Sequence, residues 1–203
     1  MRALVTGFEP FAGASVNASY AAVRRLPPRI GALDLTTAQL PTSYARSGAA
    51  LEQEIARVRP DIVLCVGEAG ERTALCIERV AINVQDAHIA DNDGRQPLDM
   101  PVVAGGPAAY FTTLPLKAIE AALRTSGLPV EVSNSAGTFV CNHVFYTLMH
   151  FGAIHAAKFR AGFLHVPGVH GPATDTRHAA TMALDDIVRA IRITLEVAQT
   201  PAR

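Results

Sequence analysis

One cysteine follows a strand-like segment and a turn in an order that could activate it. A β-branched run over residues 130–132 and a small polar run over 133–138 lead into an apolar-periodic segment. This order predicts a strand, a tight turn and a helix, with Cys141 in the first helical turn. Unpaired N–H groups and the helix dipole favour a thiolate there, and the same groups could stabilise an oxyanion. The alternative is a small core residue packed beside Phe145 and Leu148.

A nucleophilic cysteine needs a base, and the chain offers seven histidines. His143 is the nearest in sequence, but two positions along a helix turn its side chain about 200° away from Cys141. His165 ends the apolar strand predicted over 162–166, and sites in open α/β sheets form at the carboxyl ends of strands. The turn before Cys141 is expected at such an end too. The others are expected on a helix surface or end, or in a loop: His88, His150, His155, His170 and His178.

Glu78 is the candidate for the third group of a triad. It lies within a strand-like segment, residues 75–84, where a carboxylate is costly unless it is paired. Arg79 is next to it, but alternate residues of a strand point to opposite faces, so Glu78 needs another partner. An orienting carboxylate would complete the constellation of Cys141, His165 and Glu78. The residues alone leave open a core thiol, a core histidine and an unrelated acid.

Strands and helices alternate along the whole chain. Strands are expected at 3–5, 33–40, 61–67, 75–84, 130–132 and 159–166, and helices at 17–26, 42–59, 115–126, 140–150 and 181–197. This alternation predicts the α/β class, an α/β/α sandwich with a largely parallel, open twisted sheet. We expect residues 1–203 to form a single domain.

Two loops stand out from this pattern. The loop over residues 7–13 carries Phe8 and Phe11, which either cap the core or wall a pocket. Residues 85–107 show no periodicity, and so long a stretch in a compact domain is functional, interfacial or mobile. Its acidic residues lack the spacing of a calcium loop and its bidentate glutamate, so no metal site is predicted.

Composition excludes several classes of partner. The 203 residues carry 18 basic and 18 acidic side chains, a balance that does not favour nucleic acid. No apolar run is long enough to span a membrane, and no nucleotide-binding motif is present, so no cofactor is expected. Three cysteines at spacings unlike a metal motif indicate a reducing compartment, and we expect a cytoplasmic protein.

Four segments resemble the pyroglutamyl peptidase I (pyrrolidone-carboxylate peptidase) family of cysteine peptidases. They are residues 6–11 (TGFEPF), 78–83 (ERVAIN), 135–143 (SAGTFVCNH) and 162–167 (GFLHVP). The resemblance implies that Cys141 is the nucleophile, His165 the general base and Glu78 the third member of the triad. The implied reaction removes an N-terminal pyroglutamyl (5-oxoproline) residue from peptides through a thioester. It also implies a single α/β/α sandwich and a homo-oligomer, a tetramer or a dimer.

The same resemblance implies a substrate pocket. A pyroglutamyl lactam is neutral, so an apolar slot with a few hydrogen bonds suits it. In the family the two phenylalanines of the N-terminal loop, here Phe8 and Phe11, line that slot. We expect Glu68, His88 and Val140 to be substrate-binding residues as well.

Two of these positions depart from the family pattern. Residues 68–72 (EAGER) carry two acids where the family often has a neutral residue and a second glycine, and His88 stands where the family has an arginine. These departures leave two alternatives to an active peptidase. One is a catalytically weak relative that binds a lactam or a small acyl ligand. The other is a cysteine amidase for a different neutral acyl group.

Overall fold

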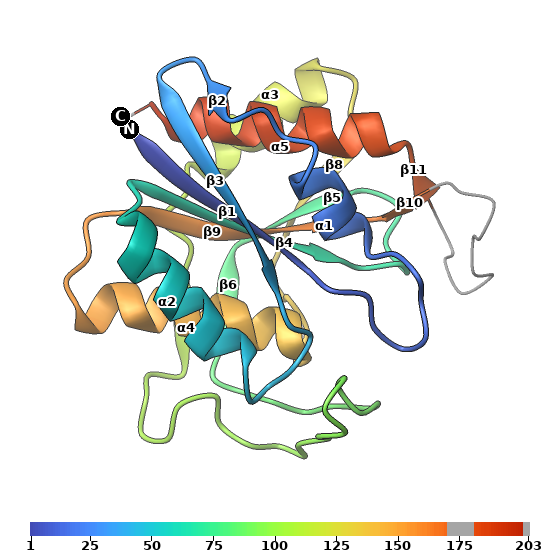
Figure 1. The fold of residues 1–203 in the computed structure, drawn as a ribbon, viewed down its shortest axis with the longest axis vertical. Coiled ribbons are helices and arrows are strands. Elements are labelled where there is room, and N and C mark those ends of the chain that lie inside the picture. The colour runs from blue at the N-terminus through green and yellow to red at the C-terminus, as the bar shows by residue number, and fades with distance from the viewer. Residues whose placement is uncertain (170–180, 201–203) are drawn as a thin grey trace.

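A seven-stranded sheet organises the computed structural model, which describes residues 1–169 and 181–200 (Figure 1). The strands of this sheet are β1 (Arg2–Phe8), β2 (Arg29–Ile30), β3 (Leu33–Leu40), β4 (Ile62–Glu68), β5 (Leu75–Glu78), β8 (Val130–Ser133) and β9 (Arg160–Val166). Their order across the sheet is β2-β3-β1-β4-β9-β5-β8. Four of the six neighbouring pairs are parallel, while β2 with β3 and β5 with β9 are antiparallel.

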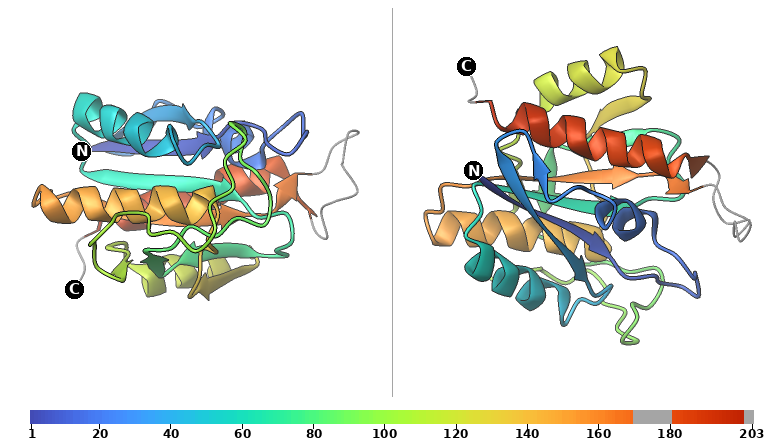
Figure 2. Two further views of the ribbon diagram at one scale, coloured as in Figure 1. Left: turned by 90° about the horizontal axis from the view of Figure 1, so that it is seen from below. Right: turned by 45° about the horizontal axis from the view of Figure 1, so that its top comes forward.

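Helices cover both faces of the sheet, as Figure 1 and the two further views in Figure 2 show. They are α1 (Ala18–Val23), α2 (Ser47–Val58), α3 (Leu116–Thr125), α4 (Val140–Ile154) and α5 (Leu184–Ala198). The helices α1, α3 and α5 pack on one face, and α2 and α4 pack on the other. The predicted α/β/α sandwich with a largely parallel sheet is confirmed.

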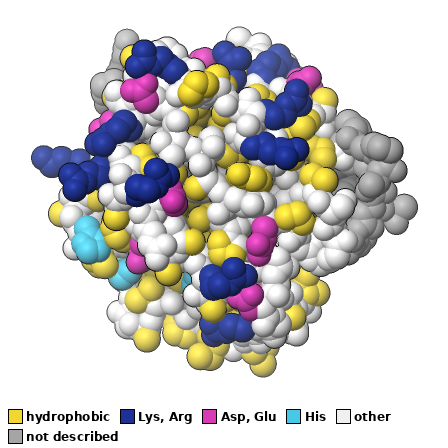
Figure 3. All heavy atoms as spheres, viewed as in Figure 1, with side chains coloured by type: hydrophobic (Ala, Val, Ile, Leu, Met, Phe, Trp, Pro, Cys, Tyr) yellow, Lys and Arg dark blue, Asp and Glu magenta, His cyan; other side chains and the backbone are white. Residues whose placement is uncertain are grey.

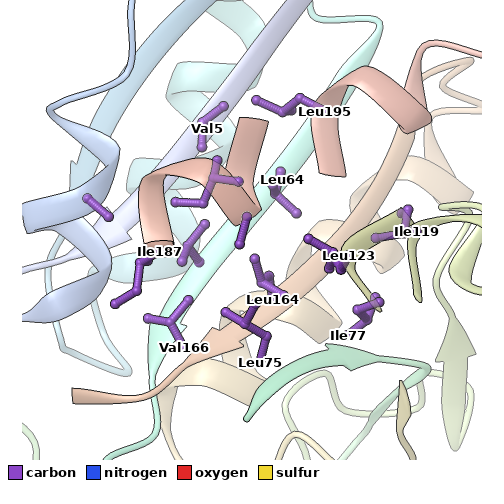
Figure 4. Packing of buried hydrophobic residues seen from close by; sticks show 14 of the residues in the cluster. Val5, Leu64, Leu75, Ile77, Ile119, Leu123, Leu164, Val166, Ile187 and Leu195 are labelled. Atoms are coloured by element: carbon purple, nitrogen blue, oxygen red, sulfur yellow. The ribbon is translucent and has the colours of Figure 1, made fainter. Parts of the chain in front are cut away.

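Each face of the sheet has its own apolar core. On the α1, α3 and α5 side, Leu64 and Leu164 of the sheet meet Leu123 of α3 and Ile187 of α5 (Figure 4). On the other side, Phe163 of the sheet packs against Phe145 of α4, with ring centroids 5.8 Å apart. A strand covered on both faces must be apolar along its whole length, which explains the continuous run of β4. The second core borders the site described below.

The segment over 75–84, expected as one strand, is divided into two. β5 ends at Glu78, and β6 (Val80–Ile82) leaves the main sheet to pair with β7 (Ala109–Phe111). The prediction of a single strand was wrong, and β7 was not predicted. The amide of Arg79 at the break donates to the carbonyl of Ser133 on β8, whereas the side chain of Asn142 holds Ile82 against α4. The end of β5 is therefore bonded to β8, whereas β6 is bonded to α4, and the two halves of the segment separate.

Other element boundaries differ by a few residues. Asn17, expected as the first residue of a helix, instead caps α1, its Oδ1 accepting from the amide of Ser19 at 3.0 Å. Ser43 caps only the turn before α2, by accepting from the amides of Ala45 and Arg46, so that helix begins at Ser47 rather than beside Ser43. Two further short strands, β10 (Gly168–Val169) and β11 (Thr181–Met182), pair with each other. The closing helix therefore begins after Met182, at Leu184.

Residues 85–107 form an irregular loop that folds back on the molecule. Gln85 and Met100 form an isolated antiparallel bridge, and the loop crosses in front of α4 in the left view of Figure 2. The Asp91 carboxylate accepts from the amide of Tyr44, and the Asp93 carboxylate accepts from Ser43 and Arg46. These acids thus fix the loop to the start of α2. The predicted positions of His170 and His178 lie outside the described residues.

Among the described residues, no helix is both long and apolar enough to cross a membrane.

Candidate active site

The thiol of Cys141 occupies the space that a side chain would need at Gly67. A Cβ built on Gly67, near the end of β4, would lie 2.8 Å from the Cys141 Sγ and 2.8 Å from the Phe163 ring. Glycine is therefore required at this position for the thiol to reach the sheet. In the parallel pairing of β4 with β9, Gly67 is the partner of His165. Paired residues of neighbouring strands point to the same face and are about 5 Å apart, so the thiol lies beside His165.

A buried carboxylate orients the histidine. The Nδ1 of His165 lies 2.7 Å from Oε1 of Glu78, which is fully buried. In the antiparallel register Cys76 faces His165, so Glu78, two residues further along β5, is a diagonal neighbour on the same face. Because a carboxylate accepts, the hydrogen bond assigns the proton to Nδ1 and leaves Nε2 as the basic nitrogen.

Arg72 supplies a second partner for this carboxylate. Its guanidinium Nη1 lies 3.1 Å from Oε1 of Glu78 and its Nη2 donates to the carbonyl of Ser135 at 2.8 Å. The other oxygen, Oε2 of Glu78, has no hydrogen-bond partner among the described residues. The expectation that Glu78 needs a partner other than Arg79 is thus confirmed, and the partners are His165 and Arg72.

The first turn of α4 is held by the residue after the cysteine. Asn142 is fully buried, accepts from the amide of Ile82 and donates to the carbonyls of Ile82 and Val84. Phe139, the residue at the helix N-terminus, provides no side-chain cap. The amides of the first turn therefore remain available to a ligand, since the first intrahelical amides have no backbone acceptor.

The expectation that the helix terminus favours a thiolate is wrong for the resting site. Burial raises the pKa of Cys141 to about 12, and the negative charge of Glu78 adds to the effect. These two causes outweigh the helix terminus, whose effect on a partly buried charge is about 2 kcal/mol at most. These surroundings favour the protonated thiol, which needs a base at the moment of attack.

The expectation that strands ending at the same edge of the sheet bring Cys141 and His165 together is wrong. The turn before Cys141 does follow the carboxyl end of a strand, β8, and His165 is close to the end of β9. However, β8 is parallel to β5, which is antiparallel to β9, so the two carboxyl ends point in opposite directions. Instead, the turn over 134–139 returns across the sheet and places the thiol over β4.

His143 faces away from the site, as expected from its helical position. It is buried against Tyr44, with ring centroids 5.6 Å apart, and its Nε2 approaches Gly48 of α2. Burial lowers the pKa of His143 to about 4, with a smaller contribution from Arg95. A neutral imidazole in this place serves the packing of α2 on α4.

The predicted substrate-binding residues fall into two groups. Phe8 is the last residue of β1 and is buried, 6.4 Å from the Phe163 ring, whereas the Phe11 ring lies 5.9 Å from that of Phe139. Val140 is buried in the same core. Phe8 and Val140 therefore back the site, while Phe11 is at its accessible side.

The two positions that depart from the family pattern differ in their surroundings. The His88 ring is exposed and lies 6.5 Å from the ring of Phe139, next to the helix that carries Cys141. Glu68 is half-buried and accepts from the amide of Ala18 at 2.5 Å, at the start of α1. Its negative charge also contributes to the raised pKa of Cys141.

Three residues of the site were not identified from the sequence. Arg72 was noted only as part of a loop, although a buried acid in need of a partner and a nearby arginine were the available signal. Phe139 meets the rings of Phe11, Tyr44 and His88, and the hydroxyl of Tyr44 donates to the carbonyl of Thr138. Nothing in the local sequence linked Tyr44 to the turn, because the two are 94 residues apart.

A thiol at a helix N-terminus beside a histidine that hydrogen-bonds a buried carboxylate is the arrangement of a cysteine hydrolase. The family model for pyroglutamyl peptidase matches residues 1–200. A pyrrolidone-carboxylate peptidase of Ralstonia nicotianae is 52% identical over 194 residues, covering 95% of this chain and 90% of the relative. One from Streptococcus pyogenes is 47% identical over 191 residues, covering 94% and 89%.

Solved structures agree with these relatives. Pyroglutamyl peptidase I from Bacillus amyloliquefaciens superposes with a TM-score of 0.93 at 42% identity, covering 97% of this chain and 96% of that one. Pyrrolidone carboxyl peptidase from Pyrococcus furiosus gives a TM-score of 0.94 at 36% identity, covering 98% of each. The chain belongs to the pyroglutamyl peptidase family, and it is a cysteine peptidase.

Alkylation by iodoacetamide should single out Cys141 and report its protonation. Cys65 and Cys76 are fully buried, and burial raises the pKa of Cys65 to about 12 and that of Cys76 to about 11. Cys141 is only partly buried, so accessibility rather than a lower pKa makes it the fast-reacting thiol. Since it rests protonated, its labelling rate should climb steadily from about pH 6 to pH 9, as the thiolate fraction grows. Peptide mapping at each pH measures this rate. A Cys141 labelling rate that is already constant from pH 6 upward, or labelling of Cys65 that is equally fast, would contradict the prediction.

Proposed function

We propose that this protein is an omega-peptidase that removes an N-terminal pyroglutamyl residue from peptides by a Cys141-His165-Glu78 triad. The observation that carries the proposal is the buried Glu78–His165 hydrogen bond beside the thiol at Gly67. Membership of the pyroglutamyl peptidase family supplies the substrate class. Residues 1–203 act as one catalytic domain.

The acylation step begins from a neutral pair. The Sγ of Cys141 attacks the carbonyl carbon of the pyroglutamyl residue while Nε2 of His165 takes the thiol proton. Glu78 holds the ring by Nδ1 and stabilises the imidazolium that forms. The carbon–nitrogen bond then breaks, and His165 returns the proton to the leaving amine. The pyroglutamyl group remains on Cys141 as a thioester.

Deacylation uses the same residues in reverse roles. Water attacks the thioester as His165 takes its proton, pyroglutamate leaves, and the thiol is regenerated. In both steps the carbonyl oxygen gains negative charge. The amides at the start of α4 can stabilise this charge. The amide of His143 bonds back to the carbonyl of Phe139, and the amides before it are unpaired within the helix, so they can donate to the oxyanion.

The aromatic side of the site suits a neutral lactam. The rings of Phe11 and Phe139 are in contact at the accessible side, backed by Phe8 and Val140. An apolar slot holds a five-membered lactam without the carboxylate that an ordinary aminopeptidase uses for an ammonium group. Glu68 and His88 complete the proposed set of substrate-binding residues at its edges.

A fluorogenic pyroglutamyl amide tests the activity and the triad together. The wild-type protein should cleave it and leave the alanyl amide intact. Cys141→Ala should abolish cleavage, and Glu78→Gln should lower kcat by roughly a hundredfold or more while KM changes little, because a mis-set base slows the reaction without weakening binding.

The other outcomes separate the alternatives. A protein that does not turn over the pyroglutamyl amide, but whose Cys141 is protected from iodoacetamide by pyroglutamate, is a binding relative. Cleavage of other neutral acyl amides in preference to the pyroglutamyl amide identifies an amidase. Full activity of a folded Glu78→Gln variant removes Glu78 from the mechanism.

A permanent positive charge at position 88 should raise the activity. Arginine is charged at every working pH, whereas a histidine is charged only in its protonated form. If position 88 supplies a cation beside Phe139, His88→Arg should raise kcat/KM measured at neutral pH. A ratio of variant to wild type at or below unity would show that His88 does not serve the site.

We also propose that the chain forms a homo-oligomer, a dimer or a tetramer. Large apolar side chains are exposed on the loop over 85–107 and on β7, including Leu98 at 79%, Phe111 at 69% and Met100 at 55%. In Figure 3 hydrophobic side chains gather along the lower edge, where Figure 1 places this loop. Such side chains are suited to an interface. Sedimentation equilibrium should give a mass at least twice 21.5 kDa, and a monomer at micromolar concentration would refute the proposal.

A cytoplasmic location suits a peptidase that depends on a free thiol. Cys65, Cys76 and Cys141 are free thiols, and a reducing compartment keeps a catalytic thiol active. Cell fractionation is the direct measurement.

A further inference from the structure

Arg72 joins two parts of the site that are far apart in the chain. It lies in the connection between β4 and β5, and its side chain is 27% exposed. One guanidinium nitrogen meets Glu78 on β5, and another donates to the carbonyl of Ser135, 63 residues away in the turn that precedes Cys141. A single planar group therefore connects the carboxylate that orients His165 with the turn that delivers the thiol.

The contact with Glu78 differs from an ordinary surface ion pair. Exposed ion pairs contribute little to the stability of a fold. Glu78, however, is fully buried, and a buried carboxylate needs a compensating charge. Oε1 of Glu78 receives both the His165 and the Arg72 contacts, while Oε2 has no hydrogen-bond partner among the described residues. The guanidinium thus fixes which oxygen faces the imidazole and keeps the carboxylate from rotating.

The contact with Ser135 acts on the turn from one side only. On the other side, Tyr44 donates to the carbonyl of Thr138, and the hydroxyl of Thr138 donates to the carbonyl of Asp86. Ser135 itself is exposed, and its amide bonds only locally, to the hydroxyl of Ser133. Arg79 bonds Asn134 at this end of the turn. It is Arg72, however, that joins Ser135 to the Glu78 carboxylate itself.

We infer that Arg72 is a positioning residue of the proposed reaction, which holds the Glu78 carboxylate against His165 and fixes the turn that carries Cys141. This inference rests on the proposed function. Arginine suits the task because its planar fork can bond two acceptors at once, which a lysine ammonium cannot do with the same geometry.

The charge of Arg72 gives the role a pH signature. Glu78 contacts Arg72 from the β4–β5 connection and His165 from β9. The thiol of Cys141 is near Glu78 of β5, Cys65 and Glu68 of β4, Arg72, and Tyr44 before α2. Arg72 itself also faces Cys76 of β5 and Glu131 of β8. Arg72 is the fixed cation of this set. Removing a positive charge from the site favours the protonated forms of the groups around it, so the acid limb of kcat/KM should move to higher pH.

Three variants and two readouts test the inference. Arg72→Met removes both contacts at similar length, and Arg72→Lys keeps the charge. Arg79→Met is the matched control, since the Arg79 side chain bonds Asn134 of the same turn but, among the described residues, makes no hydrogen bond or ion pair with the Glu78 carboxylate. Arg72→Met should lose about a hundredfold in kcat, keep KM within about threefold, and shift the acid limb up by roughly one pH unit. Arg72→Lys should lose about tenfold in kcat with its acid limb in place. Arg79→Met should match wild type within about twofold.

The second readout needs no turnover. The positive charge of Arg72 lowers the pKa of Cys141, so Arg72→Met should slow iodoacetamide labelling of Cys141 at fixed pH, while Arg79→Met should not. A wild-type protein that fails to cleave the pyroglutamyl amide overturns the proposed function, but the labelling comparison still decides the role of Arg72.

Two results would overturn the inference. One is a folded Arg72→Met variant, checked by circular dichroism, with wild-type kcat and labelling rate or with an acid limb that does not move. The other, which holds even if the methionine variant does not fold, is an Arg72→Lys variant with full kcat.

Discussion

A carboxylate with no exposed surface sets the main constraint on this structure. Glu78 can remain charged inside the sheet only if hydrogen-bond donors and a cation reach it there. Its two partners come from opposite sides in sequence: His165 from β9, 87 residues later, and Arg72 from the loop just before β5. Strand β9 must therefore be the neighbour of β5, in the antiparallel register that makes Glu78 and His165 diagonal partners. The same strand order that builds the centre of the sheet is therefore needed to bring Glu78 and His165 together.

A second constraint comes from the absence of a side chain at Gly67. The thiol of Cys141 and the ring of Phe163 converge on the place where a Cβ would be, so β4 contributes a gap rather than a reacting group. Asn142 fixes the helix start over that gap from the other side, through three hydrogen bonds to the backbone over 82–84. The resulting burial raises the pKa of Cys141, so the same packing that places the thiol also makes it dependent on a neighbouring base.

The sequence predicted what depends on local periodicity, and missed what depends on pairing between distant segments. The continuous apolar run of β4, the presence of a helix after Asn17 and the orientation of His143 follow from residues within one turn or one strand, and all are as expected. The antiparallel direction of β5 and the departure of β6 do not, because both are decided by which strand lies alongside. Arg72 was missed for the same reason, since a loop arginine has no periodicity and its partners at Glu78 and Ser135 are set by the folded sheet.

The two departures from the family pattern are now distinguished by their surroundings. Glu68 replaces a neutral residue, yet its carboxylate accepts from the amide of Ala18, where α1 begins. A carboxylate at a helix N-terminus is stabilised by the unpaired amides, so the fold has a local use for this negative charge, although the charge still acts on Cys141. His88 makes no comparable hydrogen bond within the part of the chain that the structure describes: it is exposed, next to Phe139, on a loop fixed elsewhere by Asp91 and Asp93. A change at position 88 thus leaves the fold intact and acts at the accessible side of the site, where differences in rate and substrate preference would arise.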